Sequence, residues 1–230
     1  MRICILGDSH TAALKNGWSE ISANHPGVSL TFYAARGNTL DGIEADGHDL
    51  VAGNERLRRS LEYTSGGEAR VKTSEYDAFL VCGLFFMPLW KRPGLSRAVI
   101  SAGNADRFHS SLSATAAGLG RAATAVPIYI MPRPLVAIRP DPAVAPDVPP
   151  YEEQIDQLTR DSTVRNFRFL GQPPETIAGS WWSKPEFASG SMRLGVDPKL
   201  DGEMHPDGEA DHMNAAFGSI FLLQFLRLVK

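Results

Sequence analysis

The chain has 230 residues, a formal net charge of -3 at neutral pH and 21% charged residues. This length suits one α/β domain with one sizeable core, so we expect a single domain over residues 1–230. The small negative charge argues against a broad nucleic-acid-binding surface. Cys4 and Cys82 are the only cysteines and lie in apolar runs. They fit reduced core thiols, so we expect a cytoplasmic protein with no metal and no cofactor.

The first apolar run, residues 3–6, predicts a buried strand that ends in Gly7-Asp8-Ser9. It is too short for a signal peptide, and the C-terminal apolar stretch is interrupted by Gln224 and Arg227, so no membrane span is expected. A helix is predicted over 11–24, which places Ser9 in a strand-to-helix turn beside free helix N–H groups. Such a turn suits a nucleophile, although a serine before a helix is more often a cap.

Strands and helices alternate along most of the remaining chain. This order predicts a three-layer α/β/α sandwich around a mostly parallel, five-stranded sheet of flavodoxin-like type. Long excursions are expected at about 132–150 and 173–208. In the second, the aromatic residues near 181–187 either anchor the loop to the core or form a lid. The other predicted strands are 28–35, 71–73 (a short edge strand), 76–83, 126–131 and 167–172, and the other helices are 50–63, 96–123, 151–162 and 213–229.

Four strand ends should meet at the carboxyl edge of such a sheet, where α/β proteins form their sites. They are the turns at 7–9, 36–38, 83–85 and 131–133. His212, with carboxylates nearby, precedes the last predicted helix and could reach the same edge. A serine needs a base to accept its proton, and an imidazole serves best because its pKa lies near neutral pH. Alone, His212 would instead be interpreted as a capping or exposed histidine.

These residues, in this order, resemble the blocks of the GDSL-like, or SGNH, hydrolase superfamily. Gly7-Asp8-Ser9 matches the nucleophile block, Gly37 matches the glycine after the second strand, and Gly83 matches the first position of the third block. His212 matches the last block, with Glu209 at its acidic position. The resemblance spans nearly the whole chain and implies the fold named above.

The resemblance further implies that Ser9 attacks an ester carbonyl while His212 transfers the proton. The amides of Ser9 and Gly37 would then bind the oxyanion. Where the family has an oxyanion asparagine, this chain has Phe85, which cannot donate. Asn38, beside Gly37, is a substitute at the same edge.

Three carboxylates compete to orient His212. Glu209 has the family's spacing with one extra methylene, Asp211 is adjacent in sequence, and Asp207 would require a longer loop. A serine–histidine dyad oriented by a backbone carbonyl is the remaining alternative. His10 and His205 are rivals for the base, although neither occupies the family's block.

Arg36 and Arg133 flank the predicted site, where they either hold an anionic group of the substrate or form structural contacts. The leading hypothesis is a serine esterase or deacylase that hydrolyses a small acyl ester, such as one on a carbohydrate. An acyltransferase of the same fold acting in polysaccharide modification, and a catalytically silent binding module, are the alternatives. The partner is then a small-molecule acyl ester or acylated carbohydrate. The oligomeric state is open, and a homo-oligomer is compatible with the apolar run at 84–90.

Overall fold

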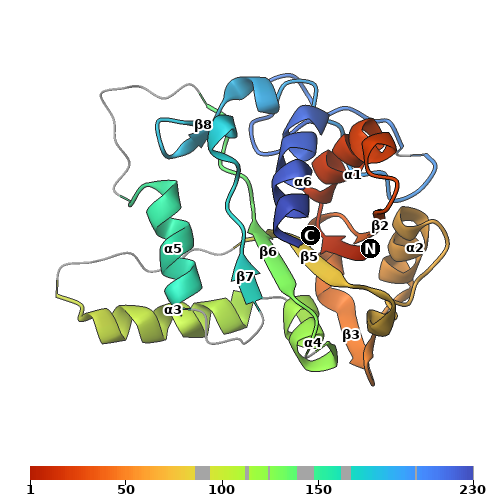
Figure 1. Cartoon of the computed structure of the whole chain (residues 1–230), viewed down its shortest axis with the longest axis horizontal. Coiled ribbons are helices and arrows are strands. Elements are labelled where there is room, and N and C mark those ends of the chain that lie inside the picture. The colour runs from red at the N-terminus through yellow and green to blue at the C-terminus, as the bar shows by residue number, and fades with distance from the viewer. Residues whose placement is uncertain are drawn as a thin grey trace.

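A computed structural model describes residues 1–85, 94–111, 114–123, 125–138, 148–161, 167–199 and 201–229. Its centre is a five-stranded sheet in the order β2-β1-β5-β6-β7, in which every neighbouring pair is parallel (Figure 1). The predicted parallel five-stranded sheet and layered α/β architecture are confirmed. The strands are β1 Arg2–Gly7, β2 Ser29–Ala34, β5 Ala78–Leu84, β6 Ile128–Pro132 and β7 Phe167–Phe169.

Alternate residues of β1 belong to two different cores, as the two-residue period of a strand requires. Ile3 and Ile5 pack with α1 and α6, whereas Cys4 and Leu6 pack with α2 and α4 on the other face. α3 and α5 lie side by side beyond the β7 edge (Figure 1). The helices are α1 Thr11–Ile21, α2 Glu55–Ser65, α3 Arg97–Ser111, α4 Ala114–Ala122, α5 Tyr151–Asp161 and α6 Ala215–Val229.

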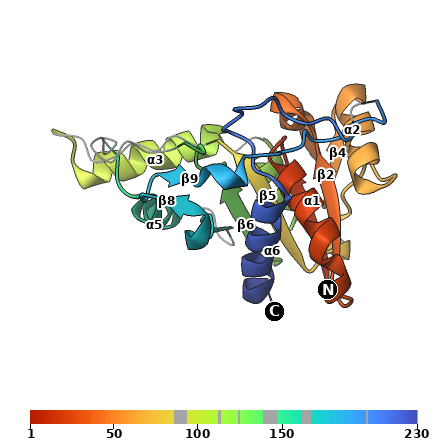
Figure 2. The ribbon, with the colours of Figure 1, turned by 90° about the horizontal axis from the view of Figure 1, so that it is seen from above.

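Helices α1 and α6 lie directly against each other (Figure 2). Two glycines make this close approach of the helices possible. A Cβ at Gly17 would overlap the backbone at Gly218 and Ser219, and a Cβ at Gly218 would overlap the carbonyl of Ala13. Ser219 also donates a hydrogen bond to the Gly17 carbonyl, at 3.2 Å. Because α1 starts just after Ser9 and α6 just after residue 212, this crossing brings the two segments to one edge of the sheet.

Two hairpins lie outside the central sheet. Residues 50–52, predicted as the start of a helix, are instead in β4, and the helix begins at Glu55. The expected edge strand at 71–73 is wrong: Val71 makes an isolated bridge to Leu50, and a 3₁₀ helix starts at Thr73. The hairpins are β3 Ile43–Asp46 with β4 Asp49–Ala52, and β8 Ile177–Ala178 with β9 Trp182–Ser183.

The single helix predicted over 96–123 is divided into α3 and α4, and the fifth strand ends at Phe169 rather than at 172. Within the excursion at 173–208, Phe187 contacts Phe217 of α6, so this aromatic anchors the loop to the core. Residues 86–90 of the apolar run at 84–90 and residues 139–147 of the excursion at 132–150 lie outside the described residues. In the described part, no helix is long and apolar enough to cross a membrane. The 3₁₀ helices are Ser22–Asn24, Gly37–Gly42, Thr73–Glu75, Pro174–Thr176 and Pro185–Phe187.

Candidate active site

Ser9 lies in a tight turn between β1 and α1. The amide of Thr11 donates to the Asp8 carbonyl at 3.1 Å, and the amide of His10 donates to the Asp8 carboxylate at 3.0 Å. The N-cap position of α1 is His10, and it makes no side-chain cap. The Ser9 hydroxyl is instead 2.9 Å from Nε2 of His212. The turn therefore presents Ser9 to an imidazole rather than using it as a helix cap.

Glu209 lies behind His212. Its Oε1 is 3.4 Å from Nδ1 of His212 and also accepts the Asp211 backbone N–H at 2.8 Å. This second hydrogen bond is the main reason that the pKa of Glu209 is lowered. The side chains of Asp211 and Asp207 are exposed. Of the three predicted carboxylates, Glu209 is the one that the structure places against the ring.

Two further histidines flank His212. The ring of His10 stacks on it with centroids 4.7 Å apart, and the ring of His205 stacks with centroids 4.1 Å apart. Burial, and after it the charge that His212 can carry, lower the pKa of His10 to about 3. The pKa of His205 is lowered too, again mainly by burial. His10 is thus neutral at physiological pH, and neither histidine contacts Ser9 in place of His212.

Gly83, near the end of β5, lies against the turn that carries Ser9. Gly83 has a φ of +83°, and a Cβ there would overlap the Asp8 carboxylate. Arg133 donates from Nε to the Gly83 carbonyl at 3.2 Å and pairs through Nη2 with Asp8, also at 3.2 Å. Its guanidinium lies 5.1 Å from the centre of the Phe85 ring, which is 56% exposed. Burial nevertheless raises the pKa of Asp8 to about 6, against the lowering effect of Arg133.

The end of the second strand contributes Gly37. Its φ of +58° is in the left-handed region, and a Cβ added there would meet no atom within 4 Å. Asn38 is exposed beside it. Arg36 is engaged elsewhere: it donates to the Leu194 carbonyl at 2.7 Å and lies 3.8 Å from Glu203. No acceptor among the described residues takes the Gly37 N–H, so this amide can bind a ligand, whereas Arg36 holds the 194–203 segment.

Donor atoms of His205, Glu209 and His212 lie within 4.8 Å of one another, and two histidines with a glutamate are a ligand set that zinc uses. However, the two rings are stacked with only 19° between their planes. A metal ion lies in the plane of each imidazole that binds it, and nearly parallel stacked rings cannot both meet this condition. As arranged, the three residues suit hydrogen bonding and stacking rather than a metal centre.

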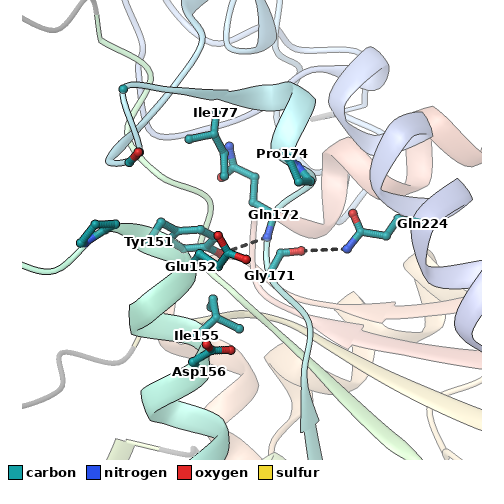
Figure 3. A pocket seen from close by; sticks show the side chains of 12 residues that line it. Tyr151, Glu152, Ile155, Asp156, Gly171, Gln172, Pro174, Ile177 and Gln224 are labelled. Carbon is teal, nitrogen blue, oxygen red and sulfur yellow. Dashed lines mark hydrogen bonds between the residues drawn. The ribbon is translucent and has the colours of Figure 1, made fainter.

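A separate cavity of about 530 Å³ lies between α5 and the segment that follows β7 (Figure 3). Its lining includes Tyr151 and Ile155 of α5 together with Gln224 of α6, and none of the residues around Ser9. Within it, the Gln172 amide donates to the Tyr151 hydroxyl, and Gln224 donates to the Gly171 carbonyl. This cavity is therefore separate from the Ser9–His212 pair.

No protein-family model matches the chain, and no curated protein matches its sequence. Several solved structures, in contrast, match the fold of the chain. The periplasmic domain of a Salmonella ser. Paratyphi A lipopolysaccharide acetyltransferase matches all of this chain and 84% of its own, with a TM-score of 0.50 and 15% identity. The chain shares its fold with this domain. Two weaker matches, each covering 99% of this chain at 10% identity, are a candidate platelet activating factor from Streptococcus pneumonia (TM-score 0.46, 83% of that chain) and a carbohydrate esterase (0.41, 64%).

In this fold the chain order brings Ser9, Gly37, Gly83 and His212 to one edge of the sheet, as the sequence pattern predicts. Three features of the site and of its supporting helices were not predicted from the sequence. The sequence gives no signal that His10 and His205 stack on His212, because stacking depends on tertiary placement. The pairing of Asp8 with Arg133 is likewise invisible. The Gly17–Gly218 crossing could have been suspected, since each glycine interrupts an otherwise good helix.

Proposed function

We propose that this protein is a serine esterase or deacylase that hydrolyses a small acyl ester, with Ser9 as nucleophile and His212 as base. The observation that carries the proposal is the 2.9 Å contact between the Ser9 hydroxyl and Nε2 of His212, with Glu209 on the far side of the ring. This is the nucleophile–base–orienter arrangement of acyl-transfer enzymes. An unrelated serine and histidine 203 residues apart would have no reason to meet in this way.

In the proposed reaction, the tautomer of His212 with its proton on Nδ1 donates to Glu209. The Nε2 lone pair then accepts the Ser9 proton as the hydroxyl oxygen attacks the ester carbonyl. His212 returns that proton to the departing alcohol, which leaves an acyl-Ser9 ester. Water, deprotonated by the same nitrogen, then hydrolyses this ester and restores Ser9.

The developing oxyanion would be held by the amides of Ser9 and Gly37. Among the described residues, neither amide donates to another partner. Phe85 supplies no donor where the fold family has asparagine, so the hole would have two amides, with Asn38 as a third donor from the neighbouring loop. Arg133, fixed beside Ser9 through Asp8, would add a positive charge and attract an anionic group of the substrate.

The first experiment is turnover of p-nitrophenyl acetate by the wild type and by Ser9→Ala and His212→Gln. Each substitution should lower kcat by at least about 1,000-fold, because the nucleophile and its base act as a unit. Ser74→Ala, at an exposed position in the 3₁₀ helix Thr73–Glu75, is the matched serine control and should retain wild-type turnover. Turnover that does not depend on Ser9 would contradict the proposal.

Acyl transfer is the second candidate, since one solved structure that matches the whole chain is an acetyltransferase domain. The acyl-Ser9 ester would pass to a sugar hydroxyl instead of water. Hydrolysis in the presence of mono- and oligosaccharides, with product analysis by mass spectrometry, separates the two. Acetylated sugar above the Ser9→Ala background supports transfer, whereas free acetate alone supports hydrolysis. If neither product depends on Ser9, the silent binding module becomes the better interpretation.

A further inference from the structure

The imidazole ring of His212 is stacked against another histidine ring on each of its two faces. The centroids of His10 and His205 lie 4.7 Å and 4.1 Å from its own, with interplanar angles of 13° and 19°. One face of an imidazole has room for one stacked ring, so the two neighbours occupy opposite faces. His212 is therefore the middle member of a stack of three histidines.

Both flanking rings are held by the backbone around them. His10 lies directly between Ser9 and the first residue of α1, and it is 5% exposed. The amide of His205 donates to the Ser191 carbonyl at 2.9 Å, in a short antiparallel pairing of 191–193 with 203–205. These contacts fix the backbone positions from which the two rings reach His212.

Hydrogen bonds do not account for the two flanking histidines. Nδ1 of His205 lies 4.0 Å from Oε2 of Glu209, which is too far for a hydrogen bond. Nδ1 of His10 and Nε2 of His205 are both buried and have no hydrogen-bond partner among the described residues. Buried polar atoms without partners are uncommon and call for an explanation. An apolar side chain would avoid this cost at either position, so the flat shape of the ring is the property that the site uses.

The orienting carboxylate is comparatively weak. Glu209 is 3.4 Å from Nδ1, longer than a good charge-assisted hydrogen bond, and it shares the same oxygen with the Asp211 amide. On the Nδ1 side of the ring, this long hydrogen bond is only a weak restraint on rotation about the χ2 bond of His212. Rings packed on both faces prevent that rotation, because turning would drive ring atoms into the neighbours.

We infer that His10 and His205 are positioning residues that clamp the catalytic imidazole of His212 from both faces, keeping Nε2 aimed at Ser9. This inference rests on the proposed function, because it describes how the base of that reaction is oriented. The clamp acts through shape. A flat ring should therefore replace either histidine, while a polar side chain of similar reach should not.

The test compares His205→Phe with His205→Gln and His205→Ala, using p-nitrophenyl acetate and normalising kcat to the fraction of sites titrated by a fluorophosphonate. His205→Phe should keep kcat within about threefold, whereas Gln and Ala should lower it by about tenfold or more, with KM unchanged, since a loosened group costs rate rather than binding. His10→Phe should likewise retain turnover. His25→Ala, which removes a histidine stacked on Trp18 far from the site, is the control and should match the wild type.

Long-range ¹⁵N NMR of the histidine rings gives a readout that does not depend on activity. The wild type and His205→Phe should show His212 in one tautomer, protonated at Nδ1, and His205→Gln should show a mixture. Equal kcat in the Gln and Phe variants, or rescue by Gln alone, would overturn the clamp. If Ser9→Ala keeps wild-type turnover, the proposed function fails instead, and the NMR result still decides whether the ring is clamped.

Discussion

Gly218 of α6 lies against the carbonyl of Ala13 in α1, so closely that a Cβ on the glycine would overlap that oxygen. The contact is made in the first turns of both helices, a few residues beyond Ser9 and His212. The distance between the nucleophile and the base is therefore set by a helix crossing that requires glycine.

Gly218→Ala should force α1 and α6 apart. Overpacking of this kind typically costs about 1–3 kcal/mol, and here the obstacle is backbone, so the upper end is expected. Turnover should fall as well, because the Ser9–His212 contact depends on the crossing. Urea unfolding and p-nitrophenyl acetate kinetics measure both effects. Gly27→Ala is the control, since a Cβ at Gly27 meets nothing within 4 Å. If both variants unfold at the same urea concentration, the crossing is not a tight one.

Gly83→Ala should disturb the Ser9 turn. The substitution combines an unfavourable positive φ with overlap of the Asp8 carboxylate. Gly66→Ala, at a φ of +88° in open space at the end of α2, carries the strain without the overlap. We expect Gly66→Ala to lose about 1 kcal/mol of stability and no activity. Gly83→Ala should lose more stability and at least about tenfold in kcat. Equal losses in the two variants would show that Asp8 does not rest on Gly83.

The carboxylate of Asp8 should make stability depend on pH. Its pKa in the folded protein is raised to about 6 from the usual 3.8, chiefly by burial. Folding therefore favours the protonated form: this contribution is fully present below about pH 3.8 and is lost as the pH rises through 6. The shift corresponds to about 3 kcal/mol. Asp8→Asn should remove it. The difference in unfolding free energy between Asp8→Asn and the wild type should thus shift in favour of the variant by up to about 3 kcal/mol between pH 4 and pH 8. A difference that does not change with pH would contradict the raised pKa.

Glu209 and Asp211 can be separated by substitution. Glu209→Gln removes the acceptor behind His212 and should lower kcat by about 10- to 100-fold, less than the roughly 10⁴-fold loss known for a well-aligned triad aspartate. Asp211→Asn should stay within about twofold, because Asp211 contributes its backbone amide and its side chain is exposed. Equal wild-type rates in both variants would remove Glu209 from the mechanism.

The centre of the sheet could be predicted because β1, β5 and β6 are apolar runs that reach Gly7, Gly83 and Pro132 at their ends. The hairpin at 43–52 was missed, although Asp46-Gly47 is a recognised hairpin signal and Gly47 does adopt a φ of +62°. The helix predicted over 50–63 starts too early, because Leu50 pairs with Ala45 in this hairpin and also bridges to Val71. Local pattern could not decide between these states.

The candidate site, like the fold, could be predicted from the sequence only in part. Ser9, Gly37 and Gly83 follow strands, so their meeting at one edge follows from a parallel sheet. The surroundings of His212 do not follow, because His205 is brought there by the pairing of 191–193 with 203–205. Such contacts between loops have no periodicity for a sequence pattern to reveal.

The central claim is that Ser9 is a nucleophile activated by His212. It is tested most directly by treating the wild type with a fluorophosphonate and locating the adduct by peptide mass spectrometry. We predict one phosphonyl group per chain, on Ser9, at a rate that falls by at least about 100-fold in His212→Gln. An unlabelled Ser9, or labelling at the same rate without His212, would contradict it.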